Sequence, residues 1–217
     1  MAPKMVAHRY RIPRGFSQAA DNKGTFMKRL LLATAALAAT AAPAFAHLDP
    51  AEHGSLMAGF THPLSGLDHI LVMIAVGLWA AQIGGRALWI VPSAFVGTMA
   101  IGFALAMAGM PLPFVEPAIL ASIVALGLLV AMAVRMNVFA GAVVVGVFAL
   151  FHGYAHGGEL GAAGALPFSA GFVIATAMLH ASGIGLGLAI GRLSAGKNLT
   201  RVLGGLTALA GLSLILG

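Results

Sequence analysis

Six long apolar runs, separated by short breaks that contain glycine, proline or basic residues, dominate the chain beyond residue 62. They cover residues 63–83, 87–109, 114–134, 137–157, 165–191 and 199–217. Each is near the roughly 20 residues that a helix needs to cross the hydrocarbon core of a bilayer. Their charge-poor character favours spanning helices over the strands of a membrane barrel. The pattern predicts an all-α, polytopic membrane protein built as a six-transmembrane-helix bundle in the lipid bilayer.

Composition supports this class and narrows the chemistry. Of 217 residues, 60% are hydrophobic and 8% are charged, which is too little polar surface to cover a soluble globule of this size. Cysteine is absent, which excludes disulfides and thiolate metal sites. The net charge of +6 does not indicate nucleic-acid binding, because seven of the twelve basic residues precede residue 30. Any metal must therefore be held by imidazole, carboxylate, carbonyl, thioether or water.

The first 46 residues have the layout of a targeting segment. A positive start at Met27-Lys28-Arg29 is followed by the short apolar region 30–42 and by the small-x-small motif Ala44-Phe45-Ala46. We predict a signal peptide that is cleaved after Ala46, with a retained transmembrane helix as the alternative. The expected organisation is a polar N-terminal extension (1–26, with Met27 as an ordinary start for the signal), the signal peptide (27–46), a periplasmic segment (47–61) and the six-helix transmembrane domain (62–217).

The basic residues beyond the leader predict the orientation of the bundle. Arg86 lies between the first and second apolar runs and Arg135 between the third and fourth, whereas Arg192, Lys197 and Arg201 lie around the junction of the fifth and sixth. Lys and Arg accumulate in cytoplasmic loops, and a cleaved signal delivers the new N-terminus outside. Both arguments predict a multi-pass protein of the bacterial inner membrane whose mature N- and C-termini face the periplasm.

Glycines recur at a spacing of four in the fifth apolar run. Gly183, Gly187 and Gly191 would lie on one helix face. Such a ladder of small residues lets a neighbouring helix backbone approach closely. It predicts tight helix packing and carries no chemistry of its own.

The first polar cluster lies at the start of the first apolar run, in His62-Pro63-x-x-Gly66-x-Asp68-His69. On a continuous helix His62 and His69 share one stripe, with Asp68 about 100° away. Pro63 suits the first helical turn, where its missing N–H costs nothing. His62 would then lie at the outer rim, with Asp68 and His69 roughly 10 Å deeper.

Two further clusters occur in the fourth and fifth runs. His152 and His156 are one helical turn apart, and Glu159 continues their face if Gly157 and Gly158 leave the helix intact. His180 is expected near the bilayer midplane. The clusters would thus descend from the outer surface toward the centre, which is the layout of an uptake path.

Ionisable groups inside hydrocarbon are costly and are by default functional. A plainer alternative exists for each of them: His180 as a hydrogen-bonding residue between helices, His62 as a helix cap, and Asp68 as a carboxylate that holds the tautomer of an imidazole. The number of these ionisable residues and their restriction to a few segments favour metal handling, because five histidines and two carboxylates gather in three helices. After cleavage, the amino group and imidazole of His47 offer a capture site. The candidate metal ligands are His47, His62, Asp68, His69, His152, His156, Glu159 and His180, and no catalytic residue is predicted.

Three segments carry a resemblance: the first cluster followed by Met73 and Val76-Gly77, then Phe151-His152-Gly153-x-Ala155-His156-Gly157-x-Glu159, then Leu179-His180-x-x-Gly183. They resemble the signature segments of the HupE/UreJ family of membrane proteins, and the similarity extends over essentially the whole mature chain. The resemblance implies a nickel permease or accessory protein associated with hydrogenase or urease, with cobalt as the alternative ion. It also implies hydrogenase or urease maturation proteins as partners.

We therefore predict a membrane permease that takes up a divalent transition metal ion, most readily nickel, for the maturation of a metalloenzyme. The ion would be cargo, with no permanently bound cofactor, and the protein would not be an enzyme. Imidazole and carboxylate bind several such metals, so affinity alone does not select nickel. Histidine must be neutral to bind, so uptake is expected to fall in acid. The alternatives are a nickel-binding accessory or sensor protein and a membrane enzyme or haem protein with paired histidine ligands.

Overall fold

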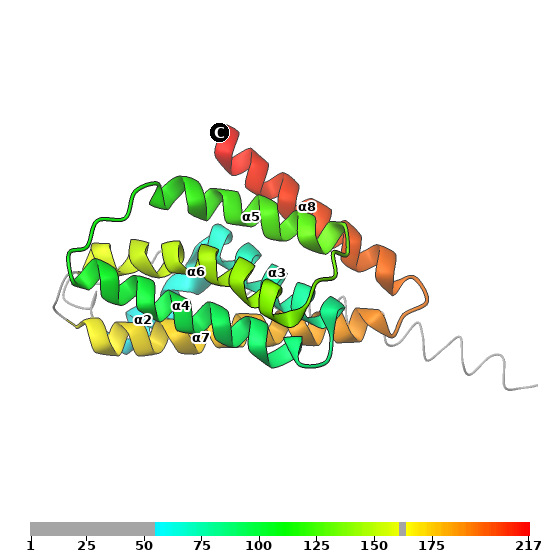
Figure 1. Cartoon of the computed structure of the whole chain (residues 1–217), viewed down its shortest axis with the longest axis horizontal. Coiled ribbons are helices and arrows are strands. Elements are labelled where there is room, and N and C mark those ends of the chain that lie inside the picture. The colour runs from blue at the N-terminus through cyan, green and yellow to red at the C-terminus, as the bar shows by residue number, and fades with distance from the viewer. Residues whose placement is uncertain (1–54, 161–163) are drawn as a thin grey trace, which may run out of the picture. The chain divides into compact units, whose positions relative to one another are not determined.

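The computed structural model describes residues 55–160 and 164–217, and these residues form helices and connecting turns without a strand. The predicted extension, signal peptide and His47 lie outside the described residues. Seven helices follow one another along the described part of the chain (Figure 1): α2 (Leu56–Ser65), α3 (Leu67–Ile83), α4 (Ala87–Met107), α5 (Val115–Ala131), α6 (Val138–Leu160), α7 (Ala165–Gly191) and α8 (Gly196–Leu216). The predicted all-α class is confirmed.

Most of these helices are long and apolar enough to cross a membrane. α4, α7 and α8 meet that criterion over their whole length, and α6 meets it over Val138–Gly158. α2 and α3 meet it only together, as a pair bent by 82°. α5 is apolar but has 17 residues, fewer than the roughly 20 that span a typical bilayer. The chain is thus a multi-pass membrane protein whose described residues include four such helices, or five if the bent pair counts as one, and the sixth span stays a prediction.

The first apolar run differs from the expected continuous helix. α2 already begins at Leu56, where the Ser55 hydroxyl accepts a hydrogen bond from the Ala58 N–H at 3.0 Å. It ends at Ser65, so Pro63 lies in its last turn and the prediction of a first-turn proline was wrong. Gly66 has an extended backbone conformation (φ −90°, ψ 121°) and separates the two helices. Proline disfavours the helical conformation of its predecessor and removes one backbone donor, which weakens the helix just before this break.

Glycines bring the helices into close pairs. A Cβ on Gly77 of α3 would collide with the His180 carbonyl of α7, and a Cβ on Gly183 would collide with the Ile74 carbonyl of α3. The α4–α6 and α5–α8 pairs show the same relation at Gly153 and Gly127. Small residues therefore permit close contact between helix backbones, as in other membrane bundles. The predicted ladder on α7 is confirmed at Gly183 and Gly187, whereas Gly191 faces open space.

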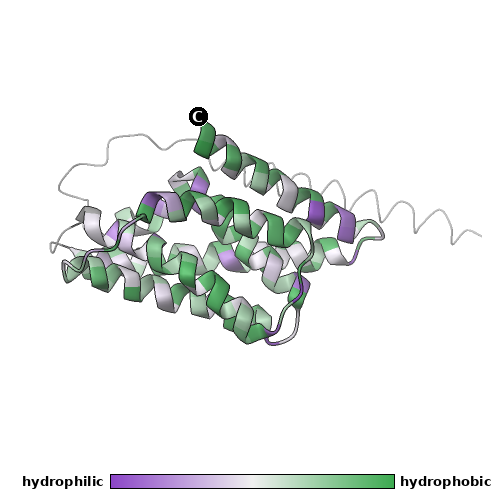
Figure 2. Cartoon of the chain, turned by 45° about the horizontal axis from the view of Figure 1, so that its top comes forward, coloured by the Kyte–Doolittle hydropathy of each residue, from purple (hydrophilic) through white to green (hydrophobic). Residues whose placement is uncertain are grey.

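α3 lies at the centre of the packing. It contacts α2, α4, α5, α7 and α8, and most of its residues from Val72 to Ala80 are buried. Large apolar side chains on the other helices are exposed, including Trp89, Phe139 and Leu166. Figure 2 shows apolar colouring along most of the helices, with polar residues near the helix ends and loops. This distribution suits a bundle whose outer surface is solvated by lipid.

The loops with basic residues share one end of the bundle. Figure 1 places the α3–α4, α5–α6 and α7–α8 connections at one end and the α4–α5 connection at the other. Arg201, in the second turn of α8, donates a hydrogen bond from Nε to the Ala131 carbonyl at 2.8 Å. The segregation that the sequence predicts is thus present, and the assignment of this end to the cytoplasm stays a prediction.

A buried indole on α3 is hydrogen-bonded to the loop that follows α5. Trp79 is fully buried and donates a hydrogen bond from Nε1 to the Val134 carbonyl at 2.8 Å. We expect Trp79→Phe to lower the free energy of unfolding by about 1–3 kcal/mol, because the carbonyl loses its partner. Thermal unfolding in detergent measures the change. Trp89→Phe is the matched control, since Trp89 is 77% exposed, and an equal loss in both variants would contradict the expectation.

Candidate metal centre

Three histidines from separate helices converge on one point. His62 lies in the last turn of α2, His69 in the first turn of α3, and His156 near the end of α6. One ring nitrogen from each lies within 4.8 Å of the others. His69 Nε2 and His156 Nε2 are 2.7 Å apart, a hydrogen-bond distance. We call His62, His69 and His156 the outer cluster.

The break at Gly66 is what assembles the outer cluster. On one straight helix His62 and His69 would be roughly 10 Å apart along the axis. Because the chain turns by 82° there, their ring centroids are 5.6 Å apart. The prediction that His69 lies much deeper than His62 was therefore wrong. A Cβ on Gly66 would also lie 2.7 Å from both Asp68 Oδ1 and His69 Nδ1, so a side chain there would press into the site.

Asp68 stands beside the cluster. Its Oδ1 lies 2.9 Å from His69 Nδ1, although the oxygen is off the direction of an aligned N–H hydrogen bond. A nearby carboxylate favours a proton on Nδ1, which leaves the lone pair of Nε2 directed at His156. Asp68 thus has the position of a group that orients an imidazole, one of the roles considered for it from sequence.

His152 lies one turn before His156 on α6. Its ring centroid is 5.9 Å from that of His69, and the side chain is fully buried. The Nδ1 atom is 3.0 Å from the Phe148 carbonyl. Since a carbonyl only accepts, Nδ1 must carry the proton, and Nε2 keeps its lone pair. The buried Nε2 has no hydrogen-bond partner among the described residues.

His180 is separate from the outer cluster. It lies in the middle of α7, is 1% exposed, and packs against Phe95 of α4 with ring centroids 5.0 Å apart. Neither ring nitrogen has a hydrogen-bond partner in the described part of the chain. The plainer interpretation of His180, a hydrogen bond between helices, therefore has no support in this structure.

Aromatic rings enclose the cluster, and sequence reasoning did not single them out. Phe172 packs against His156 with centroids 4.7 Å apart and also contacts His62 and His69. Phe168 packs against His62 at 5.8 Å. The sequence does contain a pattern that could have identified them. Phe168, Phe172, Thr176 and His180 follow each other at a spacing of four on α7, and all four are buried. Of these four, Phe168 and Phe172 form the aromatic wall beside the imidazoles of the outer cluster.

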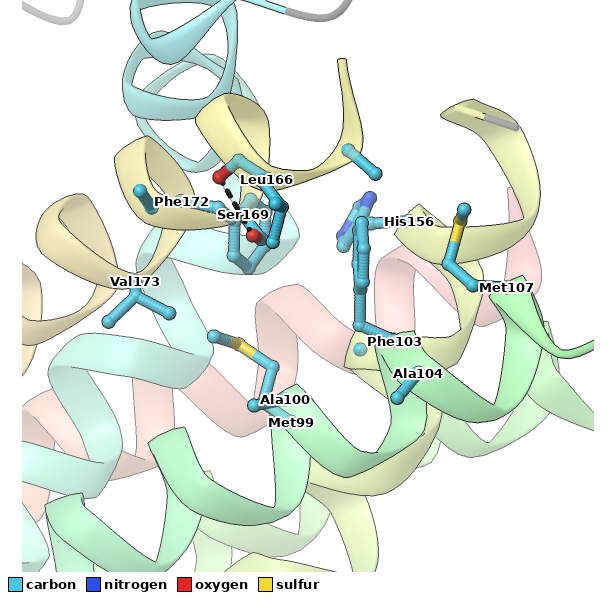
Figure 3. Close-up of a pocket in the computed structure, with 13 residues that line it drawn as sticks. Met99, Ala100, Phe103, Ala104, Met107, His156, Leu166, Ser169, Phe172 and Val173 are labelled. Atoms are coloured by element: carbon cyan, nitrogen blue, oxygen red, sulfur yellow. Dashed lines mark hydrogen bonds between the residues drawn. The ribbon is translucent and has the colours of Figure 1, made fainter. Parts of the chain in front are cut away.

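A cavity of about 610 Å³ opens beside the cluster, between α4, α6 and α7. Figure 3 shows His156 at its edge together with methionine and phenylalanine side chains of α4 and with Phe172 and Val173 of α7. Its lining is almost entirely apolar. His156 is thus the member of the outer cluster that borders this apolar cavity.

Two of the predicted metal ligands, Glu159 and His47, cannot be placed relative to the outer cluster. α6 continues through Gly157 and Gly158 to Leu160, so the helix stays intact at Glu159 as its predicted face requires. The Glu159 side chain, like His47, lies outside what the structure describes. His62, His69, His152 and His156 come together, and His180 lies apart, so the ligand roles of these residues stay predictions with a favourable geometry.

The outer cluster can hold a divalent metal ion of intermediate softness. Imidazole nitrogens suit nickel, cobalt, copper and zinc, and three of them leave coordination positions for water or a carboxylate. One proton is shared between the Nε2 atoms of His69 and His156. An ion that binds both atoms needs the lone pair of each, so this proton must move to another ring nitrogen or leave the site.

Comparison with known proteins gives a consistent result. Residues 34–214 match the HupE / UreJ protein family. The chain is 50% identical over 187 residues to Protein HupE of Rhizobium leguminosarum bv. viciae, which covers 85% of this chain and 97% of that protein. No solved structure matches the chain significantly. The family match includes every histidine described above.

Proposed function

This chain belongs to the HupE/UreJ family, and from that premise we propose that it is a membrane permease for a divalent transition metal ion, with nickel as the principal cargo and cobalt as the alternative. The ion is taken inward and supplied to the maturation of a hydrogenase or urease. The observation that carries the proposal is the outer cluster, in which three imidazoles from three helices meet inside an apolar bundle.

The arrangement suits passage better than permanent storage. A transport site must release its ion, which favours several weak stations over one closed cage. A further imidazole, that of His152, lies beside the outer cluster, one turn before His156 on α6 and 5.9 Å from His69 between ring centroids. A series of this kind lets an ion exchange ligands stepwise while it moves.

The membrane potential is sufficient to drive uptake. A divalent cation that moves inward gains about 4.6 kcal/mol per 100 mV, twice the value for a single charge. That corresponds to accumulation by roughly three orders of magnitude. Facilitated diffusion of the ion therefore needs no second energy source.

Uptake by the purified protein in proteoliposomes tests the proposal. With a potential that is negative inside, we expect saturable entry of radioactive nickel that empty vesicles lack. Cobalt should compete, whereas magnesium in similar excess should not, because magnesium prefers oxygen ligands and retains its water. Binding without entry would refute the permease and favour a nickel-binding accessory or sensor protein.

A further inference from the structure

A second polar site lies deeper in the bundle, around His180. Both ring nitrogens of His180 and the hydroxyl of Thr176 are buried without a hydrogen-bond partner in the described residues. Thr176 is fully buried and lies one helical turn before His180 on the same face of α7. Burying such groups without partners is costly, and unsatisfied buried groups in native proteins call for an explanation.

This site is well separated from the outer cluster. Phe172, which contacts all three histidines of the cluster, precedes His180 by eight residues on α7. That spacing corresponds to roughly 12 Å along the helix axis. A single ion cannot be held by His156 and His180 together, since imidazole ligands lie about 2 Å from a bound metal. The two sites are therefore distinct stations.

One ring connects the two sites. Phe95 of α4 packs against His152 with centroids 5.8 Å apart and against His180 with centroids 5.0 Å apart. His152 also adjoins His69 of the outer cluster. The order through the bundle is thus outer cluster, His152, Phe95 and His180. The Nε2 of His152, which has no partner, is the one ligand atom between the cluster and the Phe95 ring that the described residues leave available.

We propose that His180, with the Thr176 hydroxyl, forms an inner station for the same class of divalent transition metal ion, and that the Phe95 ring separates this station from the outer cluster. The inference rests on the proposed function for its direction, since it assigns the second step of the same path. His152 passes the ion inward, and the Phe95 ring must turn aside for it. Two stations of this kind allow binding at one site to assist release from the other.

The test combines nickel binding with uptake. For the purified protein in detergent, equilibrium dialysis with nickel should give about two ions per chain, and His180→Phe should give about one, bound at the outer cluster. Nickel uptake into proteoliposomes should fall at least about tenfold in this variant. Its melting temperature should stay close to that of the wild type, because His180 makes no hydrogen bond in the described structure and phenylalanine keeps a flat ring of similar shape.

A second variant and a control complete the design. Thr176→Val keeps the side-chain shape and removes the hydroxyl. It should therefore weaken binding of the second nickel ion without affecting binding of the first. In Ser182→Ala, also on α7, only a hydroxyl bonded to the Met178 carbonyl of the same helix is lost, and both ions should remain. If His180→Phe misfolds, Thr176→Val decides the question.

The outcomes separate the inner station from the permease. Unchanged stoichiometry and uptake in His180→Phe, or an unchanged second ion in Thr176→Val, would overturn the inner station while the permease stands. If the wild-type protein binds two ions, the second of which depends on His180 and Thr176, but moves none, the permease proposal fails and the inner station stands.

Discussion

His69→Ala is expected to abolish saturable nickel uptake into proteoliposomes. His69 has the most central position in the site: its ring adjoins those of His62, His152 and His156, with centroid distances of 5.6, 5.9 and 4.8 Å. Alanine removes one of three imidazoles and leaves Asp68 without the ring that it orients. Even the loss of a group that supports a metal ligand typically costs 10- to 100-fold, so we expect a loss of at least about 100-fold.

A control at the same helix start distinguishes loss of the ligand from misfolding. Leu67 is two residues before His69 on α3 and is 58% exposed. Leu67→Ala should insert into the membrane and transport normally. Nickel uptake by His69→Ala at the wild-type rate, in protein with a normal elution profile and melting temperature, would remove the outer cluster from the path.

Gly183→Ala is expected to separate α3 from α7 and to lower the free energy of unfolding by about 1–3 kcal/mol. The added methyl group would collide with the Ile74 carbonyl, which belongs to a backbone and cannot turn away as a flexible side chain does. Because the α3–α7 contact positions both His69 and His180, nickel uptake should fall as well. Thermal unfolding in detergent and proteoliposome uptake measure the two effects.

Gly185 provides the matched substitution on the same helix. A Cβ there would meet nothing within 4 Å. Alanine is a better helix former than glycine, so Gly185→Ala should be neutral or stabilising by up to about 1 kcal/mol. If both substitutions reduce stability equally, close contact at Gly183 is not what holds these two helices together.

Much of the fold was predictable because apolar runs in a membrane protein have a narrow range of lengths. The run 165–191 coincides with α7, and the runs for α4 and α6 agree to within a few residues. The histidines in these runs could be selected as candidate site residues from the sequence, since a polar group is conspicuous in an apolar segment. Hydropathy does not report helix direction, so the merging of α2 and α3 into one run concealed the turn at Gly66.

The surroundings of the histidines were harder to predict. Phe95 and Phe172 belong to segments where nearly every residue is apolar, so no periodicity distinguishes a ring that faces an imidazole from one that faces lipid. Their role depends on which helices are neighbours. Only the contacts of α4 with α6 and of α7 with α2 and α3 provide that information.

The interruption at Gly66 also has an electrostatic consequence. Backbone dipoles give a helix a partial positive charge at its start and a partial negative charge at its end, each about half an elementary charge. The end of α2, where His62 lies, therefore attracts a cation, whereas the start of α3 repels one. Asp68 occupies the first turn of α3 and offsets that repulsion with a full negative charge. The Asp68 carboxylate thus makes the electrostatic potential at the break between α2 and α3 favourable for a doubly charged cation.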